Sequence, residues 1–186
     1  QFISLSESDY TIVGEENENG GCLGGAMASA GDLDHDGKMD FILGDFWWDN
    51  PETGVDAGKA YVFLGADLGA NAQVSVADAA WSFEGDSGRQ DNDQDCEGDL
   101  EDSHICGGDW AAHSVTGGMD GDGDGTDDLL IVAYKSDEGG FNRGKIAFYS
   151  GGLLGERGTR SIADADVMIY GETEGDSLGH SVDWAG

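Results

Sequence analysis

The stretch Asp32-Leu33-Asp34-His35-Asp36-Gly37-Lys38-Met39-Asp40 decides the fold, and it recurs as Asp120-Gly121-Asp122-Gly123-Asp124-Gly125-Thr126-Asp127-Asp128. Both copies follow the pattern D-x-D-x-D-G-x-x-D. Carboxylates at the first, third and fifth positions can point inward from one tightly curled backbone. The glycine at the sixth position permits the φ > 0 turn that closes the loop. The pattern therefore predicts two loops that each bind Ca²⁺, an ion that prefers oxygen ligands.

The predicted ligands are the side chains at the first, third, fifth and ninth positions and the backbone carbonyl at the seventh. They are Asp32, Asp34, Asp36, Asp40 and the carbonyl of Lys38 in the first loop, and Asp120, Asp122, Asp124, Asp128 and the carbonyl of Thr126 in the second. Oxygen ligands favour Ca²⁺ over zinc or copper, and Mg²⁺ prefers water-rich octahedral sites. The alternative is two acidic turns without an ion, but carboxylates crowded so closely repel one another unless a cation neutralises them.

The residues after each loop exclude an EF-hand. That motif needs a bidentate Glu at its twelfth position and a helix on each side. Here the twelfth position is Leu43 in the first loop and Ile131 in the second. Short apolar runs follow the loops instead, at 39–43 and 128–132, and such runs are typical of buried strands. We therefore expect each ion to lie in a loop between two β-strands.

The chain repeats a unit of four short strands around each loop. The expected strands are 23–31, 39–43, 59–65 and 75–85 in the first unit, and 107–118, 128–132, 145–151 and 161–171 in the second. Short strands in fours, separated by turn glycines, are the pattern of propeller blades. We predict an all-β fold of four-stranded antiparallel β-propeller blades. It would be a partial propeller, with about two full blades and pieces of two more.

The predicted organisation is a single propeller segment over 1–186. It comprises the end of a preceding blade (1–21), a blade (22–85), an acidic insertion (86–107), a second blade (108–171) and the start of a next blade (172–186). A piece of a propeller leaves sheet edges open. We expect either a segment of a longer protein or copies that assemble edge to edge, and we favour the segment.

The insertion carries two of the three cysteines, Cys96 and Cys106, on either side of an acidic run. We expect a disulfide between them, as is common in extracellular proteins. A metal site that includes His104 is the alternative, although soft ligands are few there. The acidic run is also a candidate for a further cation, but its spacing fits no loop rule. Cys22 would remain as a small buried hydrophobe or an intermolecular link.

The net charge of −31 excludes partners that need a basic surface, namely nucleic acid and anionic membranes. No apolar run approaches the roughly 20 residues of a membrane span, so we expect no direct membrane insertion. The chain shows no signal peptide and opens on Gln1, which is typical of a processed or trimmed product. Because salt and divalent cations screen such a charge, we expect an extracellular or cell-surface setting.

These features together resemble the FG-GAP repeats of the integrin alpha-chain head, which is a β-propeller. Leu23-Gly24 and Leu178-Gly179 stand where that family has Phe-Gly. The GAP segment is poorly kept, since Leu43-Gly44-Asp45 and Val132-Ala133-Tyr134 occupy it. The Ca²⁺ loops are the most specific part of the resemblance. It implies that the ligands named above bind structural ions, which brace the loop between the first two strands of a blade.

The resemblance implies an extracellular module for adhesion, or for binding a protein or carbohydrate ligand. Phe46, Trp47 and Trp48 are candidate contact residues, with packing between blades as the alternative. A second interpretation is a structural subunit of a surface filament, sheath or layer, built from further copies of the chain through propeller edges. A propeller-based hydrolase or lyase is a third. His113 and His180 share a repeat position but indicate no catalytic arrangement, so we predict no enzyme activity and no catalytic residue.

Overall fold

The computed structural model describes residues 10–15, 21–68, 73–86 and 108–185. Within these ranges the chain forms eleven β-strands and three short 3-10 turns, and it contains no α-helix. The prediction of an all-β fold is therefore confirmed. Neither of the two larger sheets closes on itself, and the propeller assignment stays a prediction.

The first sheet contains the four strands of the first repeat unit. These are β2 (Ala26–Gly31), β3 (Asp40–Asp45), β4 (Lys59–Phe63) and β6 (Trp81–Glu84), and each pairs antiparallel with its neighbour in that order. A fifth strand, β10 (Gly158–Ser161), comes from the second unit and pairs parallel with β6. The sheet therefore contains strands from both repeat units.

The second sheet repeats the same antiparallel meander. Its strands are β7 (Ala111–Met119), β8 (Asp128–Ala133), β9 (Lys145–Tyr149) and β11 (Val167–Tyr170). The apolar runs that follow the two acidic loops form β3 and β8, as the sequence predicts.

A small third sheet pairs β1 (Thr11–Val13) parallel with β5 (Gln73–Ser75). Neither β5 nor β10 is expected from the sequence, which predicts one strand over 75–85 and another over 161–171. Those two predictions are wrong in their first halves, where the 3-10 turns η2 (Val76–Asp78) and η5 (Ile162–Asp164) form.

The turns form because the side chains of a serine and of an aspartate three residues later each accept a hydrogen bond from a backbone N–H group of the same short segment. Ser75 accepts from the backbone of η2 while Asp78 accepts from the backbone of Ser75, and Ser161 and Asp164 do the same around η5. This capping box gives hydrogen-bond acceptors to backbone N–H groups that, in a strand, would bond to a neighbouring strand. A third 3-10 turn, η4 (Gly151–Leu153), follows β9, and 177–185 forms no strand although the sequence predicts a third unit there.

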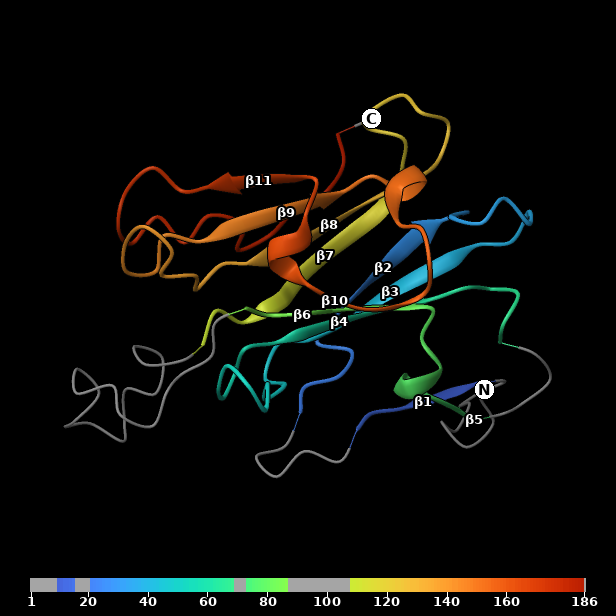
Figure 1. Ribbon diagram of the computed structural model, residues 1–186, viewed down its shortest axis with the longest axis horizontal. Coiled ribbons are helices and arrows are strands. Elements are labelled where there is room, and N and C mark those ends of the chain that lie inside the picture. The colour runs from blue at the N-terminus through green and yellow to red at the C-terminus, as the bar shows by residue number, and fades with distance from the viewer. Residues whose placement is uncertain (1–9, 16–20, 69–72, 87–107, 186) are drawn as a thin grey trace, which may run out of the picture.

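The two larger sheets pack face to face, with β7 against β2 and β3 (Figure 1). Buried residues from both sheets form one core, among them Ile42, Val62, Phe83, Leu129, Ile131 and Ala147. The backbones approach closely, since a Cβ added at Gly44 would lie 2.1 Å from the carbonyl oxygen of Ala112. This packing places the starts of β3 and β8, and thus the two acidic loops, next to each other.

Candidate metal centres

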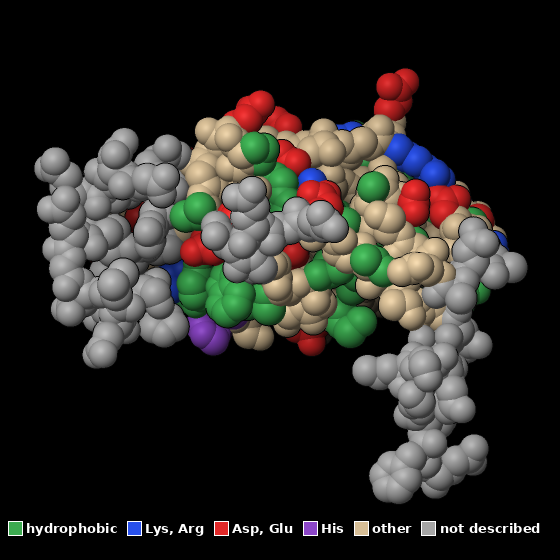
Figure 2. All heavy atoms as spheres, turned by 90° about the horizontal axis from the view of Figure 1, so that it is seen from below, with side chains coloured by type: hydrophobic (Ala, Val, Ile, Leu, Met, Phe, Trp, Pro, Cys, Tyr) green, Lys and Arg blue, Asp and Glu red, His purple; other side chains and the backbone are tan. Residues whose placement is uncertain are grey.

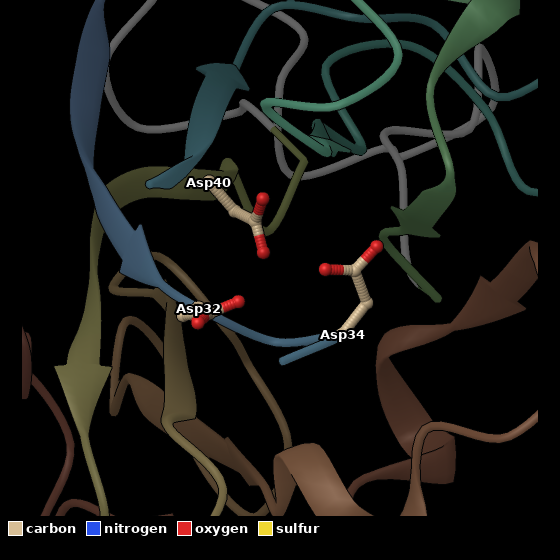
Figure 3. Close-up of side chains that lie close together, drawn as sticks. All are labelled: Asp32, Asp34 and Asp40. Atoms are coloured by element: carbon tan, nitrogen blue, oxygen red, sulfur yellow. The ribbon is translucent and has the colours of Figure 1, made fainter. Parts of the chain in front are cut away.

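The first acidic loop connects β2 to β3 and gathers three carboxylates. Asp32, Asp34 and Asp40 each offer an oxygen, and these oxygens lie within 4.8 Å of one another. Figure 3 shows the three side chains converging on one point from the end of β2, the loop itself and the start of β3. The first loop therefore has a set of hard oxygen donors of the kind that Ca²⁺ prefers.

Backbone hydrogen bonds hold this loop in its curled shape. The carboxylate of Asp32 accepts from the N–H groups of Asp36 and Gly37, each at 3.0 Å. Gly37 has φ 84°, a left-handed conformation that glycine adopts at little cost. Its role in closing the loop, predicted from the sequence, matches this backbone.

The second loop connects β7 to β8 and is likewise held by hydrogen bonds to its first aspartate. The carboxylate of Asp120 accepts from Gly123 N–H at 2.6 Å and from Gly125 N–H at 2.9 Å. Asp120, Asp122 and Asp124 again offer oxygens within 4.8 Å of one another. The same pattern thus gathers a carboxylate cluster twice, at the same point of the two units.

The last aspartate of each loop is buried and ties the loop to its sheet. Asp40 accepts from Leu33 N–H at 2.7 Å and from Gly65 N–H at 2.8 Å. Asp128 accepts at the equivalent positions, from Gly121 N–H at 2.6 Å and Gly151 N–H at 3.0 Å.

Burial raises the pKa of the Asp40 and Asp128 carboxyls above its usual value, although these N–H donors act to lower it. A nearby cation would favour the charged form of both groups.

The two loops differ in which predicted side chains join the cluster. Asp36 lies outside the first group and forms an ion pair with Lys38 at 3.6 Å, whereas Asp124 belongs to the second. Asp40 belongs to the first group, but Asp128 lies outside the second. The carbonyls of Lys38 and Thr126 stay predicted ligands.

The loops also touch each other, which the sequence does not predict. The N–H of Asp32 donates to Asp127 at 3.0 Å, and the His35 Nε2 lies 3.2 Å from the Thr126 hydroxyl. Asp127 is the only aspartate of the second pattern that is not a predicted ligand. The repeat pattern carries no signal for this contact, because it depends on how the two units pack.

A cluster of aromatic rings lies between the two units, at the opposite end of the strands from the acidic loops. Phe46, after β3, lies 5.6 Å from Trp110 and 5.1 Å from His113, measured between ring centroids. Tyr134 and His180 extend the cluster, with 4.3 Å between the rings of His113 and Tyr134 and 5.4 Å between those of His113 and His180. Packing between units, the alternative stated above for Phe46, is thus observed.

The three neighbouring aromatics of the first unit have different surroundings. Trp48 is buried and donates from Nε1 to Glu15 at 3.1 Å, with the Lys59 ammonium 4.4 Å from its ring centroid. Trp47 is 43% exposed. Of the predicted contact residues, only Trp47 offers a large surface to a partner. On the face shown in Figure 2, hydrophobic side chains gather beside a histidine and among scattered acidic groups.

A buried lysine with several acidic partners is a further cluster that sequence reasoning missed. Lys145 Nζ lies 2.6 Å from Asp86, 3.2 Å from Asp109 and 3.4 Å from Glu138. Burial acts to lower the pKa of Lys145, but Asp109 and Asp86 outweigh it and raise the pKa above its usual value. Burial also raises the pKa of Asp109, against the effect of Lys145. One sequence feature could have pointed to this lysine, because the dipeptide Gly-Lys occurs at the start of both β4 and β9.

Of the three cysteines, only Cys22 lies among the described residues. Cys22 is a free thiol, half-buried, and burial raises its pKa. Cys96, Cys106, His104 and the acidic run between them lie outside the described residues, so the disulfide and the further cation stay predictions.

The sequence matches no protein-family model and no curated protein. The described residues contain no helix that is both long and apolar enough to cross a bilayer. The family resemblance, and any function taken from it, are therefore matters for proposal.

Proposed function

We propose that this chain is an extracellular Ca²⁺-binding module of the FG-GAP type, in which two structural ions brace adjacent blades of a β-propeller. One observation carries the proposal. The D-x-D-x-D-G-x-x-D pattern folds twice into a loop whose carboxylates converge within 4.8 Å, at the same point of two repeat units. Repetition of the pattern, with a carboxylate cluster in both copies, argues against an accidental cluster of surface acids.

The electrostatics of the loops support a bound cation. Each loop brings several carboxylates within direct interaction distance, so their mutual repulsion opposes the folded form until a cation neutralises it. The donors are all oxygens, and the loop backbones are fixed by hydrogen bonds from Gly37 and Gly125. Ca²⁺ accepts such irregular oxygen sets more readily than Mg²⁺, which demands near-octahedral geometry.

The arrangement of the sheets supports the propeller interpretation. Two consecutive units each form a meander of four antiparallel strands, and the first strand of one unit, β7, packs beside the first strand of the other, β2. Blades that repeat radially in this way are the architecture of a propeller. The ions then act as structural braces of the connection between the first and second strands.

A binding role for the module is the function that the surface favours. Trp47 is 43% exposed and contacts Phe46, which itself packs against Trp110, so a large apolar ring lies on top of other packed aromatic rings. Exposed aromatic rings of this kind are common in protein and carbohydrate contacts. Assembly into a filament or layer is the second candidate, favoured by the exposed apolar side chains of the edge strand β11.

Thermal unfolding in Ca²⁺, in Mg²⁺ and in EDTA tests the proposal, combined with titration calorimetry. We expect Ca²⁺ to raise the melting temperature more than Mg²⁺ does, and the calorimetry to show two ions per chain. Asp34→Asn and Asp122→Asn should each remove one ion. Glu172→Gln, an exposed acid outside the loops, is the matched control and should keep both. Unfolding that is identical in Ca²⁺ and EDTA would refute the metal sites.

A further inference from the structure

The chain builds the same junction between units twice. Strand β5 pairs parallel with β1 so that Ser75 lies opposite Val13, and β10 pairs parallel with β6 so that Ser161 lies opposite Glu84. Val13 and Glu84 are the last residues of their strands, and both serines cap a 3-10 turn. The junction thus joins a strand and its capping box from one unit to the last strand of the preceding unit, in one fixed register.

The second junction shows what holds such a strand in place. The side chains of Ser82 and Thr159 lie 2.9 Å apart, and Trp81 Nε1 donates to the carbonyl of Glu156 at 3.2 Å. The first residue of the turn, Ile162, is fully buried in the core between the sheets. Tyr149 donates to its carbonyl at 3.0 Å.

The first junction buries Val76, the equivalent of Ile162, in a second core cluster. Each junction therefore combines edge pairing with an inserted apolar side chain.

Strand β11 is the last strand of the second unit, and it corresponds to β1 and β6, the strands that receive β5 and β10. Its outer edge has no strand partner among the described residues. It is followed by Gly171, as β1 and β6 are followed by glycine. The exposed fractions of Val167 and Ile169 are 51% and 49%, whereas the β6 residues Trp81 and Phe83 are 6% and 0% exposed. An exposed apolar edge strand is a template for pairing with another strand.

The second sheet already packs against the beginning of a further unit, at β7, the strand on the opposite edge from β11. Within 177–185, Val182 N–H donates to the Ser114 hydroxyl at 3.2 Å, so this segment lies along β7. Strand β7 lies along β2 in the same way. A partner that continues this arrangement would bring its own junction strand to β11.

We propose that the outer edge of β11 is a docking site for a parallel strand followed by a Ser-Val/Ile-Ala-Asp capping box, supplied by a further repeat unit of this kind. The serine lies opposite Tyr170, the equivalent of Glu84. The apolar residue after the serine inserts between the second sheet and the sheet of the further unit. The site does not depend on the metal centres, because its partner is recognised by backbone pairing and one apolar side chain.

The test uses the whole chain and a fluorescent peptide with the sequence of 156–166, which contains β10 and its capping box. We expect saturable binding in fluorescence anisotropy and slower amide hydrogen exchange in Val167–Tyr170. The same peptide with Ile162→Asp should bind about tenfold more weakly, equivalent to about 1.4 kcal/mol.

The chain variant Ile169→Lys should weaken binding of the unmodified peptide to a similar extent. Leu153→Lys, at an apolar residue of η4 that is 65% exposed, is the control and should bind like the original chain. The proposal would be overturned if the peptide bound without slowing amide hydrogen exchange in β11. It would also be overturned if the Ile162→Asp peptide bound as tightly as the unmodified one. Self-association of the chain that Ile169→Lys abolishes would overturn it as well, because the occupant would then be a whole second copy, whose β10 is already paired with its own β6.

Discussion

The backbone N–H of Asp32 donates a hydrogen bond of 3.0 Å to Asp127, a residue 95 positions later in the other acidic loop. Asp32 is itself a predicted ligand of the first loop, and Thr126, beside Asp127, is a predicted ligand of the second. A second contact joins His35 to Thr126 at 3.2 Å. Each loop therefore holds part of the other in position.

The first prediction concerns this link. Asp127→Asn replaces a charged acceptor by a neutral one and should cost about 1–2 kcal/mol of unfolding free energy. It should also weaken Ca²⁺ binding at the first loop, although Asp127 is no ligand there. Chemical denaturation and calorimetry measure the two effects. Glu172→Gln should change neither, and unchanged binding at the first loop in Asp127→Asn would contradict the coupling.

The buried ammonium of Lys145 gives the second prediction. Lys145→Met leaves Asp109, which is 3% exposed, without its cation, and should cost about 3–5 kcal/mol in denaturant unfolding. Lys59→Met, at the equivalent position, should cost only about 1 kcal/mol, because its partners Glu15 and Glu84 are 39% and 28% exposed. Adding Asp109→Leu to Lys145→Met should recover part of the loss. Equal costs for the two lysines would show that burial of the partners is unimportant.

The third prediction concerns acid. Burial, reinforced by the neighbouring His180, lowers the pKa of His113 below its usual value. The unfolded chain therefore binds a proton at this residue at higher pH than the folded chain does, and stability falls as the pH drops through about 6.5. Wild-type protein should lose more unfolding free energy between about pH 7.5 and about pH 5.5 than His113→Gln does. Parallel pH profiles of the two proteins would exclude this residue as the cause.

The fourth prediction tests how closely the sheets approach. A Cβ at Gly44 would lie 2.1 Å from the carbonyl oxygen of Ala112, so Gly44→Ala should cost about 3 kcal/mol by forcing the sheets apart. Gly24→Ala is the control. Its backbone has φ 82° and its added methyl group meets nothing within 4 Å, so it should cost only about 1 kcal/mol of strain. Thermal or denaturant unfolding compares them, and a smaller loss in Gly44→Ala would mean that the sheets can separate easily.

The loops and the strands that follow them could be predicted because their signals are local. Asp32, Asp34 and Gly37 fall within one short pattern, and a run of apolar residues identifies β3 without knowledge of its partners. The carboxylates of Asp34 and Asp122 accept bonds within their own loops, so the sequence pattern contains nearly all the information needed for their geometry.

The parallel strands and the buried lysine could not be predicted because their causes lie far apart in the chain. Strand β10 pairs with β6, and Ser82 meets Thr159 across 77 positions. Likewise, Lys145 meets Asp86 across 59 positions. Short segments such as Gly158–Ser161 have no apolar alternation of their own, so only packing of the complete units makes them strands.

The junction between β6 and β10 sets where the chain can be divided. Any cut between Glu84 and Gly158 separates a strand from its parallel partner, so the repeat boundary seen in the sequence is not a boundary of the folded structure. A fragment ending at residue 85 would expose the edge of β6 and would lack the buried side chain of Ile162 in the core. Engineers who wish to shorten, lengthen or permute such a protein must therefore keep each strand together with its parallel partner from the next unit, and the two units should melt together in a single transition.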